Sequence, residues 1–388
     1  MSKILLLSTW APPPDGVAFH SLALVNSWRR AGHEVLVVTA KVQGGARHTK
    51  RVALDGSGVR VTRILRLIPR RTTTFLLTDY QPDVVIVQFA IASQNTALLS
   101  TLRTMSIARR FGIPVVVAFH EPARELERLG PLSRWIYRAA ALFTTYPVVY
   151  SPAGAAALVQ AGIFTHVTEV PHGCESPMEP TKEDLARVRE RYGVHFPLVL
   201  SLGFTHVDKG TDLLVKAMTE VTLLRDGAVQ FLVAGSPRTR RGLFRLMGRA
   251  DCKFHKSLTM ESRQFTGVSV EFCGFVPDED VGALFNLASV VVLPYRRATQ
   301  SGIAQKALAA RAVIVASDIS ELRNDLGLAA RYFRSGSVSD LVETLVSVLR
   351  DPQNELRDAA ATRAKERNYD VVSARLLDLG LSGGRPSQ

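Results

Sequence analysis

The chain has 388 residues, 46% of them hydrophobic and 21% charged, which is enough for two domain cores and argues against a disordered protein. A net charge of +13 suits anionic partners, but the arginines are spread along the chain without a zinc-finger, RRM-like or helix-turn-helix signature, so we expect no nucleic acid. Three distant cysteines, Cys174, Cys252 and Cys273, argue against a disulfide framework or zinc site and suit a reducing cytoplasm.

The N-terminal apolar run is too short for a signal segment and is predicted to be the first strand. No apolar run approaches the roughly 20 residues that a membrane span needs.

Short apolar runs alternate with helix-like segments along the whole chain, a pattern typical of parallel sheets with helices on both faces. In the first half, strands are expected at 3–8, 33–40, 59–64, 83–89, 113–119 and 148–151. In the second half, they are expected at 198–204, 229–235, 268–275, 290–295, 313–318 and 330–333. The predicted fold class is therefore α/β, with two Rossmann-like parallel-sheet domains that face a cleft.

A proline-rich, charged segment followed by one helix marks a linker near the middle of the chain. We expect an N-terminal domain over 1–176 and a C-terminal domain over 177–362. A helix over 363–381 is expected to pack back toward the N-terminal domain, and the glycine-rich end, 382–388, is expected to be a flexible tail.

Two candidate binding residues of the first half follow expected strands, where open parallel sheets bind ligands. Gly16 ends a proline-rich loop before a helix, where backbone amides could approach an anion, although a plain turn fits as well. His120 follows the strand at 113–119, with Glu121 beside it. We expect His120 to point toward a ligand rather than the core and to hydrogen-bond a sugar hydroxyl or handle a proton, a capping role being the alternative.

Two loops of the second half suggest an anion site. Lys209 precedes a glycine and a helix, so its compact charge could neutralise a diphosphate, unless it is only a solvated lysine. Ser301 and Gly302 precede a helix of small residues whose unpaired amides could receive a phosphate, the alternative being a structural turn. Lys306 lies in the first turns of that helix.

The densest basic segment alternates cations with large apolar side chains and fits either a solvated helix face or a patch for a membrane surface or an acceptor. Its cations are Arg238, Arg240, Arg241, Arg245, Arg249, Lys253 and Lys256.

Taken in order, several segments resemble those of family-4 glycosyltransferases of the GT-B fold, over nearly the whole chain. The segments are "PPPDGVAFHSLAL", "VVVAFHEP", "VPHGCE", "LSLGFTHVDKGTDLLVKAM", "VQFLVAGSP" and "SGIAQKALAARAVIVASD". The resemblance implies an acceptor on the N-terminal domain, a nucleotide-sugar donor mainly on the C-terminal one, and retention at the anomeric carbon. It also implies no bound metal and no cofactor, the nucleotide sugar being a substrate.

The resemblance implies a role for each matching residue. Gly16 would approach the donor phosphate or the acceptor, His120 the transferred sugar, and Lys209 the diphosphate, with the Ser301 and Gly302 amides on the same phosphates. Charge develops on the departing nucleoside diphosphate, and a lysine and helix-terminal amides stabilise it. Catalysis is therefore assigned to His120 and Lys209, and donor binding to Gly16, Gly203, His206, Lys209, Ser301, Gly302 and Lys306.

The chain departs from the family pattern at two glutamates separated by seven residues, which align here to Ala298 and Lys306. A lysine cannot accept hydrogen bonds from a ribose diol. The arginine that often accompanies the lysine is replaced by Phe204, with His206 close enough to compensate in part. Three explanations stay open: altered donor recognition, which we favour, lost catalysis that leaves a binding or partner subunit, and a lipid-linked sugar phosphate as donor.

The expected protein is a metal-independent hexosyltransferase of polysaccharide or glycolipid biosynthesis, cytoplasmic and peripheral at the inner face of an anionic membrane. Its acceptor would be a sugar, a lipid-linked saccharide or a small molecule. A nucleotide-sugar epimerase is an alternative that needs carboxylates in the cleft, for which Glu121 and Glu175 are the candidates. The absence of G-x-G-x-x-G before the first helix disfavours a dinucleotide-dependent oxidoreductase.

Overall fold

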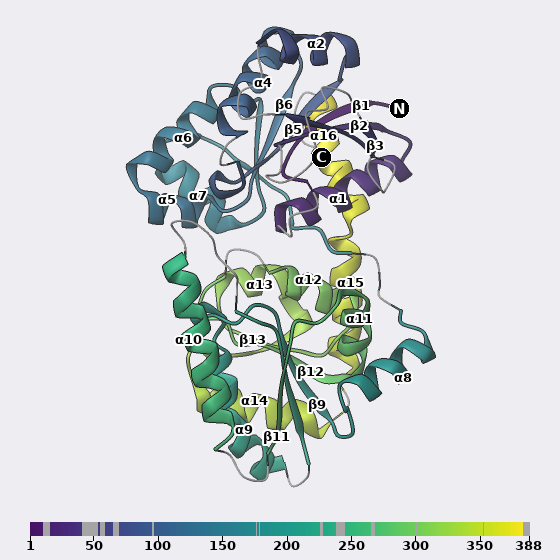
Figure 1. Cartoon of the computed structure of the whole chain (residues 1–388), viewed down its shortest axis with the longest axis vertical. Coiled ribbons are helices and arrows are strands. Elements are labelled where there is room, and N and C mark those ends of the chain that lie inside the picture. Colours follow the sequence, from purple (N-terminus) through teal and green to yellow (C-terminus); the bar gives the residue numbers. More distant parts are fainter. Residues whose placement is uncertain are drawn as a thin grey trace. The chain divides into compact units, whose positions relative to one another are not determined.

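A computed structural model describes residues 1–10, 16–40, 53–54, 59–64, 70–94, 97–175, 177, 179–225, 228–237, 245–264, 268–298, 301–351 and 353–382. The chain divides into two compact units (Figure 1). Unit 1 comprises Met1–Gly173 and Tyr369–Gln388, and unit 2 comprises Cys174–Asn368.

Unit 1 contains an eight-stranded sheet in the order β3-β4-β2-β1-β5-β6-β7-β8. β3 pairs with β4 in antiparallel fashion, and the remaining pairs are parallel. Its strands are β1 Lys3–Leu7, β2 Glu34–Ala40, β3 Ala53–Leu54, β4 Arg60–Ile64, β5 Val84–Phe89, β6 Val115–Phe119, β7 Tyr146–Val149 and β8 Thr168–Glu169. All but β3 and β8 were expected, and these two are too short to show as apolar runs.

Helices cover both faces of this sheet, which explains why every side chain of β5 is buried. α1 (Gly16–Arg30) and α16 (Tyr369–Leu381) pack on one face, where Trp28 and Leu376 join the core. The other face is covered by α2 (Arg70–Tyr80), α4 (Leu98–Arg110), α6 (Pro131–Ala141) and α7 (Pro152–Gln160), which bury Met105 and Tyr137. The remaining helices of unit 1 are α3 (Ile91–Gln94) and α5 (Pro122–Leu129).

Unit 2 contains a six-stranded parallel sheet in the order β11-β10-β9-β12-β13-β14, and each strand was expected. The strands are β9 Leu198–Leu202, β10 Gln230–Ala234, β11 Ser269–Gly274, β12 Ala288–Leu293, β13 Ile314–Ser317 and β14 Ala330–Phe333. The described residues of the two units therefore confirm the α/β class with mainly parallel sheets.

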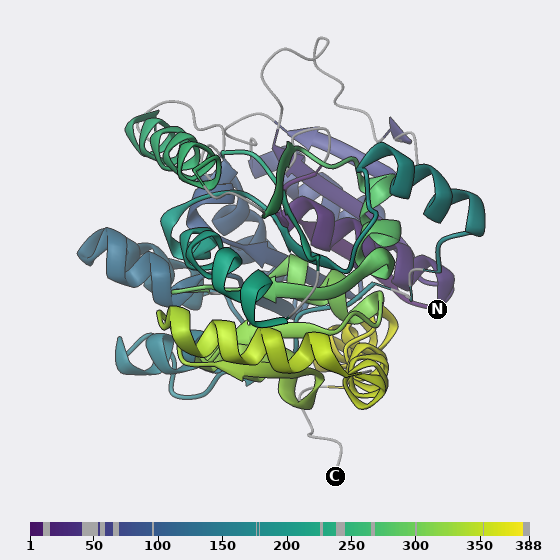
Figure 2. The same cartoon turned by 90° about the horizontal axis from the view of Figure 1, so that it is seen from below.

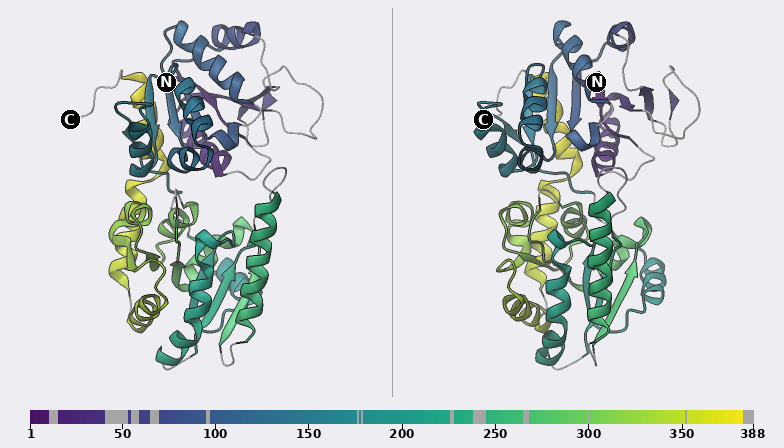
Figure 3. Two further views of the ribbon diagram at one scale, coloured as in Figure 1. Left: turned by 90° about the vertical axis from the view of Figure 1, so that its left-hand side faces the viewer. Right: turned by 60° about the vertical axis from the view of Figure 1, so that its left-hand side comes forward.

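The helices of unit 2 form two layers. α9 (Thr211–Arg225) and α14 (Val338–Arg350) contact each other and cover one face of the sheet (Figures 1, 2 and 3). The other face meets α8 (Lys182–Arg191), α11 (Asp278–Leu287), α12 (Gly302–Ala309), α13 (Ser320–Leu326) and α15 (Asn354–Glu366). α10 (Arg245–Ser262) and the short turns η2 (Val207–Lys209) and η4 (Gly327–Ala329) complete the unit.

The end of the chain contains two helices rather than one. The sequence predicted a single helix over 363–381, whereas α15 ends at Glu366 and α16 begins at Tyr369. α16 packs on α1 and on β5 and β6 within unit 1.

In each sheet the strand order reverses at one pair of neighbouring strands, β1 and β5 in unit 1 and β9 and β12 in unit 2. Ligands of open α/β sheets bind beyond the carboxyl ends of the strands at such a reversal.

Candidate functional site

In unit 2, Tyr295 joins the loop after β9 to the start of α12. The Lys209 Nζ atom lies 3.5 Å from the centroid of the Tyr295 ring, a cation–π contact. Tyr295 is 2% exposed, and its hydroxyl is 3.2 Å from the Ser301 hydroxyl. Lys209 and Ser301, which the family resemblance places on the same phosphates, therefore lie close together beside the strand reversal.

The first turn of α12 has a serine cap and a glycine as its first residue. Ser301 caps the helix, its Oγ accepting a hydrogen bond from the Ala304 amide at 3.2 Å. A Cβ atom added to Gly302 would meet no described atom within 4 Å, so the described chain gives no steric reason for glycine there. Helix N-termini of this kind bind phosphates through free amides and the helix dipole.

Glycines allow the loops around this site to approach one another. Gly210 has φ +62°, and a Cβ atom there would lie 1.8 Å from the carbonyl oxygen of Pro294. Gly203, at φ +126°, follows β9, and its carbonyl oxygen would lie 1.8 Å from a Cβ atom on Gly235. The backbones that follow β9, β10 and β12 therefore meet at distances that only glycine permits.

A salt bridge fixes the turn that carries Lys209. Arg296 donates two hydrogen bonds to Asp212, at 2.7 and 2.6 Å, and its amide donates to the Asp208 carbonyl at 2.8 Å. His206 precedes this turn, with its Nδ1 atom 3.9 Å from an Asp208 carboxylate oxygen. The turn that carries Lys209 is thus held to the loop after β12.

The two positions that align to the family glutamates have other surroundings. The Lys306 ammonium is 3.1 Å from a carboxylate oxygen of Asp278, at the start of α11. Ala298 packs against the core of unit 2. Lys306 is therefore ion-paired within the protein, and neither position supplies an acceptor for a ribose diol.

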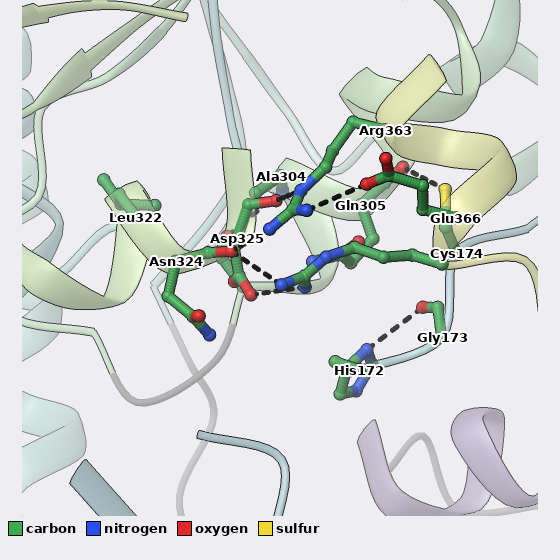
Figure 4. Close-up of polar contacts among 12 residues, drawn as sticks. His172, Gly173, Cys174, Ala304, Gln305, Leu322, Asn324, Asp325, Arg363 and Glu366 are labelled. Atoms are coloured by element: carbon green, nitrogen blue, oxygen red, sulfur yellow. Dashed lines mark hydrogen bonds and ion pairs between the residues drawn. The ribbon is translucent and has the colours of Figure 1, made fainter. Parts of the chain in front are cut away.

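Buried polar contacts hold α12 and α13 at the end of α15 (Figure 4). Asp325 pairs with Arg367 at 2.8 Å, and these side chains are 7% and 3% exposed. Burial raises the pKa of Asp325 even though Arg367 opposes the change. Cys174 donates through its thiol to the Gln305 carbonyl of α12 at 3.1 Å and through its amide to the Arg367 carbonyl at 2.6 Å. Cys174 thus links α12 to the residue that follows α15.

In unit 1, His120 lies differently from the prediction. It is 4% exposed, and its Nε2 atom is 2.7 Å from the Gln88 side-chain oxygen of β5. The ring is thus more buried than expected, with its Nε2 atom facing Gln88 on the neighbouring strand, opposite Ala118 of β6, and its role toward a sugar stays a prediction. Glu121, rather than His120, is the N-cap residue of α5.

His120 belongs to a buried hydrogen-bonded network that the sequence analysis did not assign. Tyr150 donates to the Gln88 oxygen at 3.0 Å, so the Tyr150 hydroxyl accepts from His20 Nε2 at 2.9 Å. His20 Nδ1 then accepts from Tyr369 of α16 at 3.1 Å. By the same reasoning His120 carries its proton on Nε2 and donates to Gln88.

Burial favours the neutral forms of His20 and Tyr150. Burial, with smaller effects of His172 and His120, lowers the pKa of His20 well below its usual value. Burial also raises the pKa of Tyr150. The His172 ring centroid lies 4.6 Å from that of His20. The sequence contains little sign of this network, because Tyr150 lies within the expected strand 148–151 and β8, which precedes His172, has only two residues.

Several assigned residues remain outside such contacts. Gly16 is the exposed first residue of α1, and a Cβ atom there would meet no described atom within 4 Å. The proline-rich loop before it lies outside the described residues, as do Arg238, Arg240 and Arg241 of the basic segment. Glu121, a candidate for epimerase chemistry, pairs with Arg124 at 3.0 Å.

Among the residues that the structure describes, no cluster of three or more His, Cys, Asp or Glu side chains is arranged to hold a metal ion. In the same part of the chain, no helix is long and apolar enough to cross a membrane.

Two family models match the sequence, one in each half. Residues 14–176 match Glycosyltransferase Family 4, and residues 197–351 match Glycosyl transferases group 1. A comparison with curated protein sequences gives no match.

Solved structures share the fold across the whole chain. Sucrose-phosphate synthase from Thermosynechococcus elongatus is 17% identical, with a TM-score of 0.73 and 98% of each chain covered. HepE from Anabaena, in complex with UDP and glucose, is 17% identical, with a TM-score of 0.72 and 99% of this chain and 100% of that chain covered. The UDP-forming trehalose-phosphate synthase from Burkholderia vietnamiensis is 15% identical, with a TM-score of 0.70 and 97% and 96% covered.

At these identities the structural likeness shows the fold, and the family models supply the class of protein. With glycosyltransferase models over 14–176 and 197–351 and this fold over the whole chain, the protein belongs to the GT-B glycosyltransferases.

Proposed function

We propose that the protein is a retaining glycosyltransferase that moves a sugar from a nucleotide-sugar donor to an acceptor hydroxyl. The observation that carries this proposal is the meeting of Lys209 and Ser301 at Tyr295, beside the strand reversal of unit 2. The HepE structure, described as a complex with UDP and glucose, supports a donor of the nucleoside-diphosphate type.

The proposed site suits a leaving nucleoside diphosphate. Negative charge grows on the diphosphate as the bond to the sugar breaks, and fixed positive groups lower the energy of that state. Lys209 is held by the face of Tyr295 rather than by a carboxylate at that contact, so the contact positions the ammonium without neutralising it. The amides at the start of α12 add partial positive charge, and Gly302 leaves room for a phosphate to approach.

We assign His120 to the transferred sugar, with Gln88 and Tyr150 as positioning residues. A buried ring whose Nε2 proton is held by Gln88 suits a hydrogen bond to a sugar hydroxyl better than proton exchange with water. His120→Ala should lower kcat far more than donor affinity. Gln88→Leu should reproduce part of that loss, since the ring would lose its acceptor. An unchanged kcat in His120→Ala would refute the assignment.

The remaining parts of the proposal rest on the family resemblance and on the charge of the chain. They are metal-independent catalysis, a sugar, lipid-linked or small-molecule acceptor, a role in polysaccharide or glycolipid assembly, and a cytoplasmic location peripheral to an anionic membrane. Ala298 and the ion-paired Lys306 suggest that the donor ribose is recognised by groups other than the family glutamates. Activity that survives excess EDTA would support the metal-independent reaction, and activity lost in EDTA would contradict it.

Donor binding can be tested with thermal shifts against UDP, GDP, ADP, dTDP and their sugars. A ligand at about a hundred times its Kd stabilises the folded state by about 2.7 kcal/mol. Lys209→Ala should abolish the shift given by the wild-type ligand. Lys216→Ala is the matched control, because Lys216 is an exposed lysine of α9, outside the turn that carries Lys209. An equal shift in Lys209→Ala would contradict the phosphate assignment.

A second candidate is a subunit that binds a nucleotide sugar without turning it over, which the missing carboxylates at Ala298 and Lys306 favour. The two candidates differ in whether free nucleoside diphosphate is formed from the donor. A thermal shift with a donor sugar, without free nucleoside diphosphate formed in the presence of acceptor mixtures, would support the binding subunit.

A further inference from the structure

The outward face of α6 and the residue after it carry an exposed apolar stripe. Leu132, Trp135 and Leu142 are 60%, 65% and 77% exposed, although Ile136 and Tyr137 of the same helix are buried in the core of unit 1. At 3.6 residues per turn, the three exposed side chains fall within about 80° of the helix surface. The three side chains therefore lie on one side of the helix surface.

Arginines border this stripe. Arg134 and Arg138 are exposed on the adjoining side of α6. The sequence contains no acidic residue from Gly130 to Thr145. Glu125 of α5 is buried and Glu121, which precedes α5, pairs with Arg124, whereas Glu127 of α5 is exposed. We call Leu132, Arg134, Trp135, Arg138 and Leu142 the α6 patch.

We propose that the α6 patch docks the protein on an anionic lipid surface. A tryptophan beside leucines suits the boundary between head groups and acyl chains, because its ring is apolar and its N–H is polar. Arginines beside it attract anionic head groups while their stems stay in apolar contact. A helix with this division of faces lies in the plane of the interface.

The chemistry favours lipid over a protein partner. A stable protein interface buries roughly 800 Å² on each partner, more than one narrow stripe on a single helix supplies. A lipid surface needs no matching shape, and its negative charge complements the two arginines. This surface lies in unit 1, whereas the basic segment considered in the sequence lies in unit 2. The inference rests on the peripheral membrane location proposed above, and it does not depend on the proposed donor or reaction.

Tryptophan emission gives a test specific to this patch. The chain has three tryptophans, of which Trp10 and Trp28 are 3% and 1% exposed. A change in the solvent-exposed emission therefore reports Trp135. Phosphatidylcholine vesicles containing one third phosphatidylglycerol should shift the emission to the blue, and brominated acyl chains in those vesicles should quench it. Pure phosphatidylcholine vesicles should give a much smaller change, and high salt should weaken the binding.

Variants separate the apolar contribution of Trp135 to lipid binding from the contribution of the two arginines. Sedimentation with the anionic vesicles should show roughly tenfold weaker binding for Trp135→Ser and for the double variant Arg134→Ser/Arg138→Ser. Leu223→Ser on α9, where Leu223 is 74% exposed, and Arg189→Ser on α8 are matched controls that should bind as the wild type.

Three results would overturn the proposal. The first is no binding of the wild type at low salt, and the second is undiminished binding of the patch variants. The third is a blue shift that grows with protein concentration in the absence of vesicles, which would assign the face to a second copy of the chain.

Discussion

His20 should make the stability of unit 1 depend on pH in a way that one substitution removes. The ring is 2% exposed, and both of its nitrogens are hydrogen-bonded, Nε2 to Tyr150 and Nδ1 to Tyr369. Protonation of Nδ1 would turn an acceptor into a donor facing the Tyr369 hydroxyl, and it would place a charge in a buried site. The pKa of His20 is lowered for this reason, first by burial and then by His172 and His120.

The sign and size of the effect follow from proton linkage. In the unfolded chain His20 has a pKa near 6.5, while its pKa in the folded protein is lower. Below pH 6.5 the unfolded state therefore binds more protons, and the free energy of unfolding falls as the pH falls. With the folded ring neutral throughout, the loss between pH 7.5 and 5.5 is about 1.4 kcal/mol. Above pH 7.5 the contribution of His20 is constant.

Urea unfolding followed by tryptophan emission measures this in the right part of the chain, because Trp10, Trp28 and Trp135 all belong to unit 1. The measurement compares the wild type and His20→Gln at pH 7.5 and pH 5.5. Glutamine can keep a hydrogen bond without titrating. The wild type should lose about 1.4 kcal/mol more than the variant. The comparison cancels the contribution of His33, another histidine of unit 1 with a lowered pKa. An equal loss in both proteins would refute the reasoning.

Three further predictions concern unit 2, whose unfolding can be followed by circular dichroism. Gly210→Ala should destabilise the unit by more than about 1 kcal/mol, because residue 210 has a positive φ and its new Cβ would overlap a carbonyl oxygen. Gly302→Ala is the control and should change the free energy of unfolding by less than about 0.5 kcal/mol. Asp325→Asn should lower the free energy of unfolding by about 3–5 kcal/mol, because it leaves the buried Arg367 without its carboxylate. Asp318→Asn should cost less than about 1 kcal/mol, because Asp318 and its partner Arg323 are 44% and 55% exposed. Lys306→Glu should tighten the binding of a nucleoside diphosphate, measured by calorimetry, if the ribose diol lies beside residue 306. Asp278 next to it is 71% exposed, so its repulsion of the new carboxylate is screened. Equal or weaker affinity would contradict a ribose at this position.

The sequence by itself determined the strands and the class of fold. Runs such as 84–87 and 290–293 are continuously apolar, and such runs are stable only where helices cover both faces of a parallel sheet. Loop residues after those strands could be named as candidates because the carboxyl ends of parallel strands share one edge of a sheet. The strands β3 and β8 left no such signal, because a strand of two residues has no pattern to read.

Only the tertiary structure decided which of these residues meet. Tyr295 looked like the end of an apolar run, yet its ring joins Lys209 to Ser301 across a long stretch of sequence. His120 had the position of a ligand-facing residue, but its neighbour on the adjacent strand draws it into a buried network that reaches α16. Contacts of this kind depend on distances between segments remote in the chain, and neither composition nor spacing along the sequence encodes those distances. The sequence thus set which strands and helices form, and packing set the surroundings of each polar side chain.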